Sequence, residues 1–324
     1  MFDLIPAAMP DDNYNSVVLS GLLAKAKEYA RASKAPSTLR TYLSAWSSFT
    51  TWCASRSLAS CPASPEVIVA YIADRADLLR PQSIKKHLAA ISQVHKMAGH
   101  ESPVQTQPVR AVMKGLRKTK GVAAKPKKAL RVEHVRKMVA TVPVGIVGVR
   151  DKAILLLGFV GGMRRSEIVG LDAGDIAFEP EGIALLIRRS KRDQDGKGRH
   201  VAVPRGHHEA TCPVRALRAW LDVAAVTDGP LFVRLDPGGA CRRLRLDGRA
   251  VAHVVQRAAG RAGLDPEMFS GHSLRRGFCT EAARAGAAER DIARTTGHTS
   301  MAVLRGYVEA GTLFEQCAAS VLDL

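Results

Sequence analysis

Residues 271–311 read GHSLRRGFCTEAARAGAAERDIARTTGHTSMAVLRGYVEAG. The apolar spacing in this stretch predicts short helices at 272–286, 288–296 and 300–310. His272 and Arg275 are three residues apart, so a helix places them on one face. His298 stands in a Thr-Gly-His sequence, which is typical of a helix end. Tyr307 follows nine residues later on an apolar-patterned segment.

A tyrosine flanked by cationic and proton-relaying groups suggests chemistry on phosphorus. An ordinary phenol has a pKa of about 10. To attack near neutral pH it needs a nearby base and positive charge on the phosphoryl oxygens. Taken alone, His272 is more simply a structural histidine and Arg275 a surface charge, so the combination carries the prediction.

The composition indicates a polyanionic partner. The chain has 324 residues, enough for two domains. Its 48 Lys and Arg against 30 Asp and Glu give a net charge of +18. An excess of this size favours nucleic acid as the partner. The alternative is a basic soluble protein without an anionic partner.

The cysteines and the apolar segments argue against several other classes. The 6 cysteines are scattered and form no Cys-x-x-Cys pair, so a disulfide framework or zinc site is not expected. His207, His208 and Cys212 lie close together but lack a second ligand pair. No signal peptide or membrane span is expected. We therefore predict a cytoplasmic protein without a metal or other cofactor.

The chain is expected to be mainly α-helical with a small antiparallel β-sheet. We predict a flexible arm at 1–14, a helical bundle at 15–117, a basic linker at 118–129 and a second domain at 130–324. The predicted strands of the second domain are 174–178, 183–188 and 200–204, and its last helix is 312–322. The rest of that domain is expected to be mostly helical.

Basic side chains of the bundle and the linker are candidate DNA contacts. Such charges follow a phosphate backbone without reading base sequence. The alternatives are a solvated helix face for the bundle and a linker that its lysines merely keep soluble, and the concentration of charge in the linker favours DNA contact there. The candidates are Arg40, Lys85, Lys86, Lys118, Lys120, Lys125, Lys127 and Lys128.

Two further motifs precede the C-terminal stretch. The sequence GGMRRSE at 161–167 lies between an apolar helix and a new helix start, so Arg164 emerges where backbone packs tightly. A guanidinium there offers a planar fork to two phosphoryl oxygens. The loop SKRDQDGKGR between two strands supplies Lys191, which can donate a proton to a leaving oxygen.

The order of these motifs resembles the tyrosine recombinase (phage integrase) family over nearly the whole chain, with a layout like its Cre-like branch. The resemblance implies an N-terminal core-binding domain and a C-terminal catalytic domain that together form a C-shaped clamp on DNA. It also implies a site-specific recombinase that needs neither metal nor ATP. The alternatives are a type IB topoisomerase-like relaxing enzyme and a catalytically silent DNA-binding accessory protein.

The resemblance implies a role for each matched position. Tyr307 is the expected nucleophile, which forms a 3′-phosphotyrosyl bond and releases a 5′-hydroxyl. Arg164 and Arg275 are expected to hold the non-bridging oxygens, and Glu167 to steady the pocket. His272 is expected to accept the tyrosine proton.

The remaining implied roles concern the phosphate and the leaving group. His298 is expected to donate a hydrogen bond to the phosphate. Lys191 is expected to protonate the leaving oxygen, and Lys197 in the same loop is the runner-up. Arg165 and Arg276, each beside a matched arginine, are expected to be supporting or DNA-facing.

The implied partner is double-stranded DNA with inverted-repeat recombination sites. The implied assembly is a homotetramer, in which the apolar stripe of the C-terminal helix docks on a neighbouring protomer. An exchange of this kind is heterologous and can close a ring. The alternative is that the helix packs on its own domain.

Overall fold

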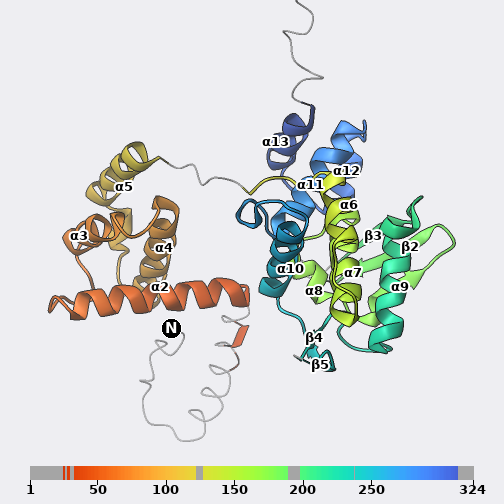
Figure 1. The fold of residues 1–324 in the computed structure, drawn as a ribbon. Coiled ribbons are helices and arrows are strands. Elements are labelled where there is room, and N and C mark those ends of the chain that lie inside the picture. Colours follow the sequence, from red (N-terminus) through yellow and green to blue (C-terminus); the bar gives the residue numbers. More distant parts are fainter. Residues whose placement is uncertain are drawn as a thin grey trace, which may run out of the picture. The chain divides into compact units, whose positions relative to one another are not determined.

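The computed structural model describes residues 25, 28, 29, 33–121, 127–188, 198–236 and 238–312. The chain divides into two compact units, Met1–Lys125 and Pro126–Leu324 (Figure 1). Within the ranges given above, no helix has the length and apolarity needed to cross a membrane. Several predicted features lie outside the described residues: the arm at 1–14, Lys125, Lys191, Lys197 and all but the first residue of the helix at 312–322.

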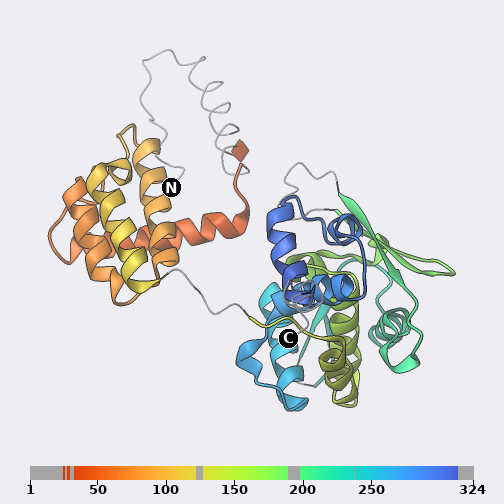
Figure 2. The same cartoon turned by 90° about the horizontal axis from the view of Figure 1, so that it is seen from above.

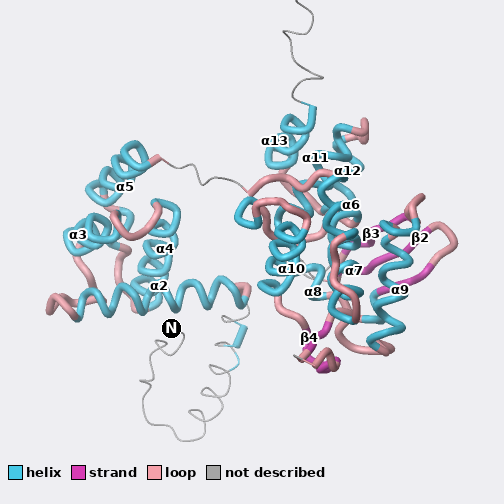
Figure 3. Tube along the Cα trace, viewed as in Figure 1, coloured by secondary structure: helices cyan, strands magenta, loops and turns pink. Residues whose placement is uncertain are grey.

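The described part of the first unit is a bundle of helices (Figure 3). They are α2 (Pro36–Ala54), α3 (Pro65–Ala76), α4 (Pro81–Met97), the short 3-10 helix η1 (Pro103–Gln105) and α5 (Gln107–Lys120). α2, α3 and α4 each begin with proline, which costs no hydrogen bond at the first helical position. Apolar residues of α2, α3 and α4, such as Phe49, Tyr71 and Ile91, are fully buried in a common core. The helical character predicted here is confirmed.

The second unit is organised around α7 (Ile146–Val160), which ends in the apolar run AILLLGFV. A helix that is apolar on every side is expected to be buried on every side, and residues 153–159 are all buried. The helices that contact α7 are α6 (Val132–Ala140), α8 (Arg165–Gly170), α9 (Pro213–Ala224), α10 (Gly248–Arg261) and α11 (Gly271–Arg284).

A small antiparallel sheet confirms the predicted strands, in the order β1 (Ile176–Phe178), β2 (Gly182–Ile187) and β3 (Arg199–Pro204). Leu185 of β2 pairs with Ile176 on one side and Val201 on the other. β1 begins two residues later than predicted, because residues 173–175 form a 3-10 turn. The Asp175 carboxylate closes that turn by accepting the Asp172 N–H (2.9 Å).

The rest of the unit is mostly helical, as expected, but it also contains a second sheet that the sequence reasoning did not predict. β4 (Val233–Leu235) and β5 (Cys241–Arg245) form an antiparallel hairpin. The β5 sequence CRRLR is exposed along nearly its whole length. Because neither face of this strand is buried, it lacks the alternation that marks a strand in sequence.

The C-terminal segment contains α11, α12 (Glu289–Thr296) and α13 (Met301–Thr312), which confirms the three short helices predicted there. α13 lies against α11 (Figures 1 and 2). A separate apolar cluster holds it there: Leu304 is fully buried with Cys279, Ala283 and Ile292. This cluster therefore fixes the helix that carries Tyr307.

Candidate active site

The carboxylate of Glu167, in the first turn of α8, accepts hydrogen bonds from two arginines. The Arg164 backbone N–H donates to its Oε2 (2.9 Å) and Arg164 Nη1 donates to its Oε1 (2.6 Å). Arg199 Nη2 also donates to Oε2 (2.9 Å). The carboxylate is 0% exposed, and a buried charge must be paired. Glu167 therefore joins guanidinium groups from α8 and β3, two segments far apart in sequence.

The same guanidinium groups, with a third from Arg275, meet at the C-terminal end of α12. The last carbonyls of a helix have no partner within the helix, and they carry partial negative charge. The carbonyls of the last two residues of α12 and of its C-cap, Gly297, each accept a hydrogen bond from one arginine. The pairs are Arg199 Nη1 with the Thr295 carbonyl (2.5 Å), Arg275 Nη1 with Thr296 (2.5 Å) and Arg164 Nη2 with Gly297 (3.4 Å).

Arg275 lies on the buried face of α11 and is 4% exposed. Its Nη1 also donates to the Gly162 carbonyl (2.9 Å). Gly162 has φ +56, and a Cβ there would lie 2.7 Å from both Phe278 and Thr296, so the tight backbone packing predicted before Arg164 is confirmed. Burial, followed by the charge of Arg164, lowers the pKa of Arg275 to about 10. Arg275 therefore remains a cation at neutral pH.

The cluster has an excess of positive charge. Three guanidinium groups surround the one carboxylate of Glu167. Among the described residues, Arg275 Nη2 and Arg199 Nε are buried without a hydrogen-bond partner. Fixed donors with net positive charge are suited to the oxygens of a phosphate group.

His298 follows the end of α12, as the Thr-Gly-His sequence predicted. Gly297 caps the helix with φ +64, in the left-handed region. Nδ1 of His298 lies 2.7 Å from Oγ1 of Thr296, and this hydroxyl donates to the Ile292 carbonyl (2.6 Å). A hydroxyl has one proton, so Nδ1 of His298 must carry the hydrogen in their contact. Nε2 then donates a hydrogen bond only when the ring is protonated.

Tyr307 lies on α13 beside His298 and Arg276. The ring centroids of Tyr307 and His298 are 6.0 Å apart. The guanidinium carbon of Arg276 lies 5.5 Å from the Tyr307 ring centroid. Thr280 Oγ1 donates to the Tyr307 carbonyl (3.3 Å). Tyr307 is therefore held against α11, the helix that also carries Arg275.

The remaining predicted residues are placed less fully. His272 lies in the first turn of α11 and is exposed, whereas Arg275 on the same helix is buried. Arg165 is exposed, as expected for a supporting or DNA-facing residue. Lys191 and Lys197 lie outside the described residues, so the proton donor stays a prediction.

Arg199 is a site residue that the sequence reasoning missed. It begins β3, and Val201 and Val203 share its side of the strand and are buried. The sequence feature that could have revealed it is a charged residue two and four positions before valines that lie on the buried face of the strand. Gly297 leaves the space that Arg199 needs, because a Cβ on Gly297 would lie 2.6 Å from Arg199 Nε.

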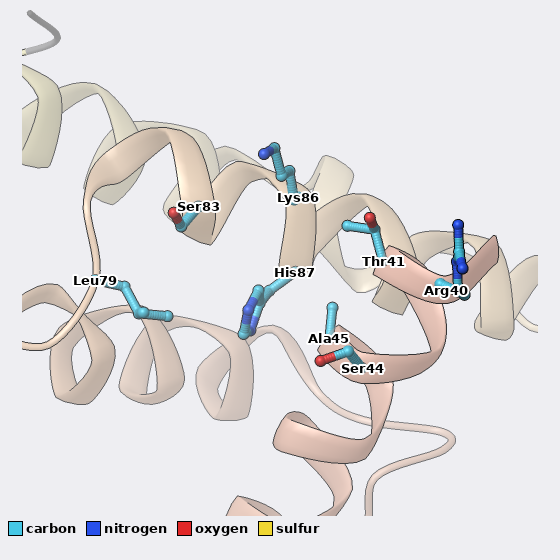
Figure 4. Close-up of a pocket in the computed structure, with 8 residues that line it drawn as sticks. All are labelled: Arg40, Thr41, Ser44, Ala45, Leu79, Ser83, Lys86 and His87. Carbon is cyan, nitrogen blue, oxygen red and sulfur yellow. The ribbon is translucent and has the colours of Figure 1, made fainter. Parts of the chain in front are cut away.

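In the first unit, the predicted DNA contacts Arg40, Lys85 and Lys86 are exposed. Helices α2 and α4 border a hollow of about 430 Å³ (Figure 4). Lys86 and His87 reach it from α4, and Arg40 from α2. The hollow is lined by Arg40, Thr41, Ser44, Ala45, Leu79, Ser83, Lys86 and His87.

The lysines predicted for the linker differ in their surroundings. α5 continues to Lys120, so Lys118 and Lys120 lie on a helix. Lys120 Nζ forms an ion pair with Asp77 (2.8 Å). Lys127 Nζ donates to the Glu267 carbonyl in the second unit, and Lys128 is exposed.

Comparisons with known proteins show the family to which the chain belongs. The phage integrase family model matches residues 128–312, more than half of the chain. The integrase/recombinase xerD homolog of Selenomonas ruminantium is 38% identical over 301 residues, which cover 92% of this chain and 88% of that protein. Recombinase cre of Escherichia phage P1 is 25% identical over 322 residues, covering 93% and 91%.

A solved structure shows the same fold. A lambda integrase dimer bound to a COC′ core site has a TM-score of 0.59 at 20% identity, with 89% of this chain and 94% of that chain covered. The chain belongs to the phage integrase family, with a Cre-like layout. The predicted class, a site-specific recombinase of the tyrosine recombinase type, is thereby confirmed.

Proposed function

We propose that this recombinase cuts and rejoins DNA strands through a covalent bond between Tyr307 and the 3′ phosphate of the cut strand. The observation that carries the proposal is the cluster of Arg164, Arg199 and Arg275 around one buried carboxylate. A tyrosine stands on the helix packed against Arg275's own helix. Fixed positive charge stabilises the oxygens of phosphorus in the transition state.

In the proposed cleavage step, the phenolic oxygen of Tyr307 attacks phosphorus and the bond from phosphorus to the 5′ oxygen breaks. His272 accepts the phenolic proton. Arg164 and Arg275 bind the non-bridging oxygens. Glu167 contributes by orienting Arg164 and by neutralising part of the charge of the cluster.

Two further side chains act on the phosphate and on the leaving group. His298 donates from Nε2 to a non-bridging oxygen in its protonated form, because its Nδ1 hydrogen is directed at Thr296. Lys191 protonates the departing 5′ oxygen, or Lys197 does so from the same loop. A 5′-hydroxyl then attacks the phosphorus of the phosphotyrosine, and the bond from phosphorus to the Tyr307 oxygen breaks. The 5′-hydroxyl proton returns to the lysine, His272 returns its proton to the phenolic oxygen, and the phosphodiester is restored. The bond energy is conserved in the tyrosyl bond, so ATP is not required, and the arginine cluster takes the charge-stabilising role that a metal ion would otherwise have.

The proposed partner is double-stranded DNA with inverted-repeat sites. The net charge of +18 and the exposed Arg40, Lys85 and Lys86 support DNA binding. Lys118, Lys125, Lys127 and Lys128 are proposed to extend these phosphate contacts. We propose that the two units close on DNA as a clamp, in the cytoplasm.

The assembly on DNA is proposed to be a homotetramer. In it, the segment after Thr312 docks on a neighbouring protomer. Deletion of residues 312–324 is expected to leave binding to a single site intact and to abolish assembly. Unchanged recombination by the shortened protein would contradict this part of the proposal.

Covalent trapping tests the proposed chemistry. Labelled duplex DNA from the region around the protein's own gene is mixed with wild-type protein or Tyr307→Phe, with and without EDTA, and the mixture is denatured. We expect a protein–DNA adduct with the wild type alone, while Tyr307→Phe still binds the DNA in a gel shift. An adduct that persists in Tyr307→Phe, or one that EDTA abolishes, would refute the proposal.

The DNA substrate separates this function from the two alternatives. A site-specific recombinase forms the adduct at one position of the fragment. Equal adduct formation throughout an unrelated plasmid, together with relaxation of its supercoils, would favour a relaxing enzyme. Tight binding with no adduct on any fragment would favour an accessory protein.

A further inference from the structure

We propose that Arg276 is a positioning residue that holds the Tyr307 ring. It connects this ring to residues 127–130, the entering segment, where the chain begins the second, catalytic unit. This inference rests on the proposed role of Tyr307 as the nucleophile. Arg276 follows Arg275 on α11, and its guanidinium carbon lies 5.5 Å from the centre of the Tyr307 ring. A cation over an aromatic face is attracted by the negative face of the ring.

α11 contacts Tyr307 at two points. Arg276 lies over the ring, and Thr280 donates to the backbone carbonyl of Tyr307 (3.3 Å). Because 276 and 280 are four residues apart, they lie on the same face of the helix. Arg275 is directed instead at Gly162 and the end of α12. α11 therefore presents the phosphate-binding arginine and the contacts to the tyrosine on different sides.

The same guanidinium group of Arg276 is also fixed by residues 127–130, the entering segment. Nη1 of Arg276 donates to the Lys127 carbonyl (3.0 Å). That segment is itself attached to the catalytic unit by backbone carbonyls of the residues before and within α11. Its attachments are Lys127 Nζ to Glu267, the Lys128 N–H to Met268 (2.8 Å) and the Leu130 N–H to Ser273 (3.2 Å).

The close packing of this segment keeps it in place. Leu130 is fully buried, and a Cβ on Gly277 would lie 2.2 Å from its carbonyl oxygen. Nε of Arg276 is buried without a hydrogen-bond partner among the described residues. A buried unpaired donor requires an explanation. The contact between this guanidinium group and the Tyr307 ring supplies one, because it holds the group where Nε has no acceptor.

A rate measurement tests the consequence for catalysis. A displacement of about 1 Å in a reacting group can cost up to roughly 100-fold in rate. We expect Arg276→Met to slow adduct formation at saturating DNA by roughly tenfold or more, with the DNA affinity unchanged. Arg276→Lys should recover part of the rate, because it keeps the cation. Arg284→Met, on the exposed last turn of the same helix, is the matched control and should behave as wild type. Wild-type rates in Arg276→Met would overturn the inference.

A spectroscopic measurement tests the placement of the ring without DNA. The protein is labelled with 3-fluorotyrosine, and the ¹⁹F resonance of residue 307 is identified by its loss in Tyr307→Phe. Arg276→Met is expected to shift and broaden this resonance, whereas Arg284→Met should not. An unchanged resonance in Arg276→Met would overturn the inference. If the wild type forms no adduct, the proposed function fails, and this experiment still decides the role of Arg276.

A double substitution tests the tie to the entering segment. Lys127→Gly removes the attachment to Glu267 and loosens the backbone that holds Arg276. We expect it to slow adduct formation, and we expect Lys127→Gly/Arg276→Met to be no slower than Arg276→Met alone. Interacting residues show such non-additive effects. Rate losses that multiply would show that Lys127 and Arg276 act independently, against the proposal.

Discussion

At the scale of single residues, Glu167 keeps three mutually repelling cations compatible with a folded protein. Its carboxylate contacts Arg164 and Arg199 directly, and both of these reach the end of α12. The helix carbonyls provide the remaining negative partners. The site is thus positive enough to hold a phosphate and still sufficiently neutralised to remain buried.

Glu167→Gln tests this balance. The amide retains the shape of the side chain but leaves two partly buried guanidinium groups without the buried counter-charge of Glu167, so we expect a loss of about 3 kcal/mol in the free energy of unfolding. Urea denaturation measures it. Glu289→Gln, whose carboxylate is 36% exposed and paired with Arg305, is the control and should lose at most about 1 kcal/mol. Equal stability of the two variants would mean that Glu167 does not compensate the cluster.

Gly297→Ala tests the fit between the end of α12 and Arg199. The residue has φ +64, and its new Cβ would lie 2.6 Å from Arg199 Nε. Backbone strain of this kind costs about 1–3 kcal/mol, and the displaced arginine should also reduce adduct formation. Gly170→Ala in α8, where a Cβ meets nothing within 4 Å, is the matched control. Unfolding curves that coincide for the two variants would argue against this fit.

The pKa of Arg275 gives a prediction with a definite sign. Burial lowers this pKa well below the ordinary value of a guanidinium group, to about 10. Between the pKa of the folded protein and the higher pKa of the unfolded chain, the unfolded chain binds more protons, so the contribution of this group to stability rises with pH there. The positive charge of Arg275, which phosphate binding requires, is lost in the same pH range. DNA affinity should therefore acquire an additional decline as the pH passes about 10, and Arg275→Gln should lack it. An identical pH dependence in both proteins would contradict the assigned contact.

At the scale of elements, α13 is attached to the unit mainly through a small apolar cluster. Leu304 is fully buried there, while Met301 and Val303 on the same helix are exposed. The nucleophile therefore stands on an element whose local stability is separable from that of the main core around α7.

Leu304→Ala tests this attachment. Removal of a buried leucine side chain costs about 2–5 kcal/mol, and we expect the loss to appear as local opening of α13. Hydrogen exchange of the α13 amides should accelerate and adduct formation should fall, while exchange in α7 changes little. Val303→Ala, at a position that is 45% exposed, is the control. Uniform acceleration throughout the unit would show that α13 belongs to the main core.

Elements whose burial follows a simple period were predictable from the sequence. Ile84, Leu88, Ile91 and Val94 of α4 are all buried at the predicted spacing. The β4–β5 hairpin was not predictable in this way, because its arginines are exposed on both sides of β5. A strand without a buried face leaves no periodic signal.

The site was predictable where motifs are local. Arg164 with Glu167, and Gly297 with His298, are each formed within a few residues. Arg199 was missed because its partners are 32 and 96 residues away, and a sequence pattern does not show such contacts. Nor does it show that Arg276, beside Arg275, is directed at a different target.

At the scale of the whole molecule, the net charge of +18 implies salt-dependent DNA binding. Each phosphate contact that is lost should reduce the slope of log affinity against log salt concentration by about 0.9. We expect this reduction for Arg40→Gln and Lys86→Gln in a binding titration. Lys120→Gln should have a smaller effect, because this lysine is already paired with Asp77. A larger change for Lys120→Gln than for the other two would contradict the proposed DNA face.

The most direct test of the account is the chemical identity of the covalent linkage. The trapped adduct is digested, and mass spectrometry locates the nucleotide on a peptide, while the freed DNA end is labelled by polynucleotide kinase without prior phosphatase treatment. We predict a nucleotide 3′-phosphate on Tyr307 and a 5′-hydroxyl that accepts the label. A nucleotide on any other residue, or a 5′ end that labels only after phosphatase treatment, would contradict the account.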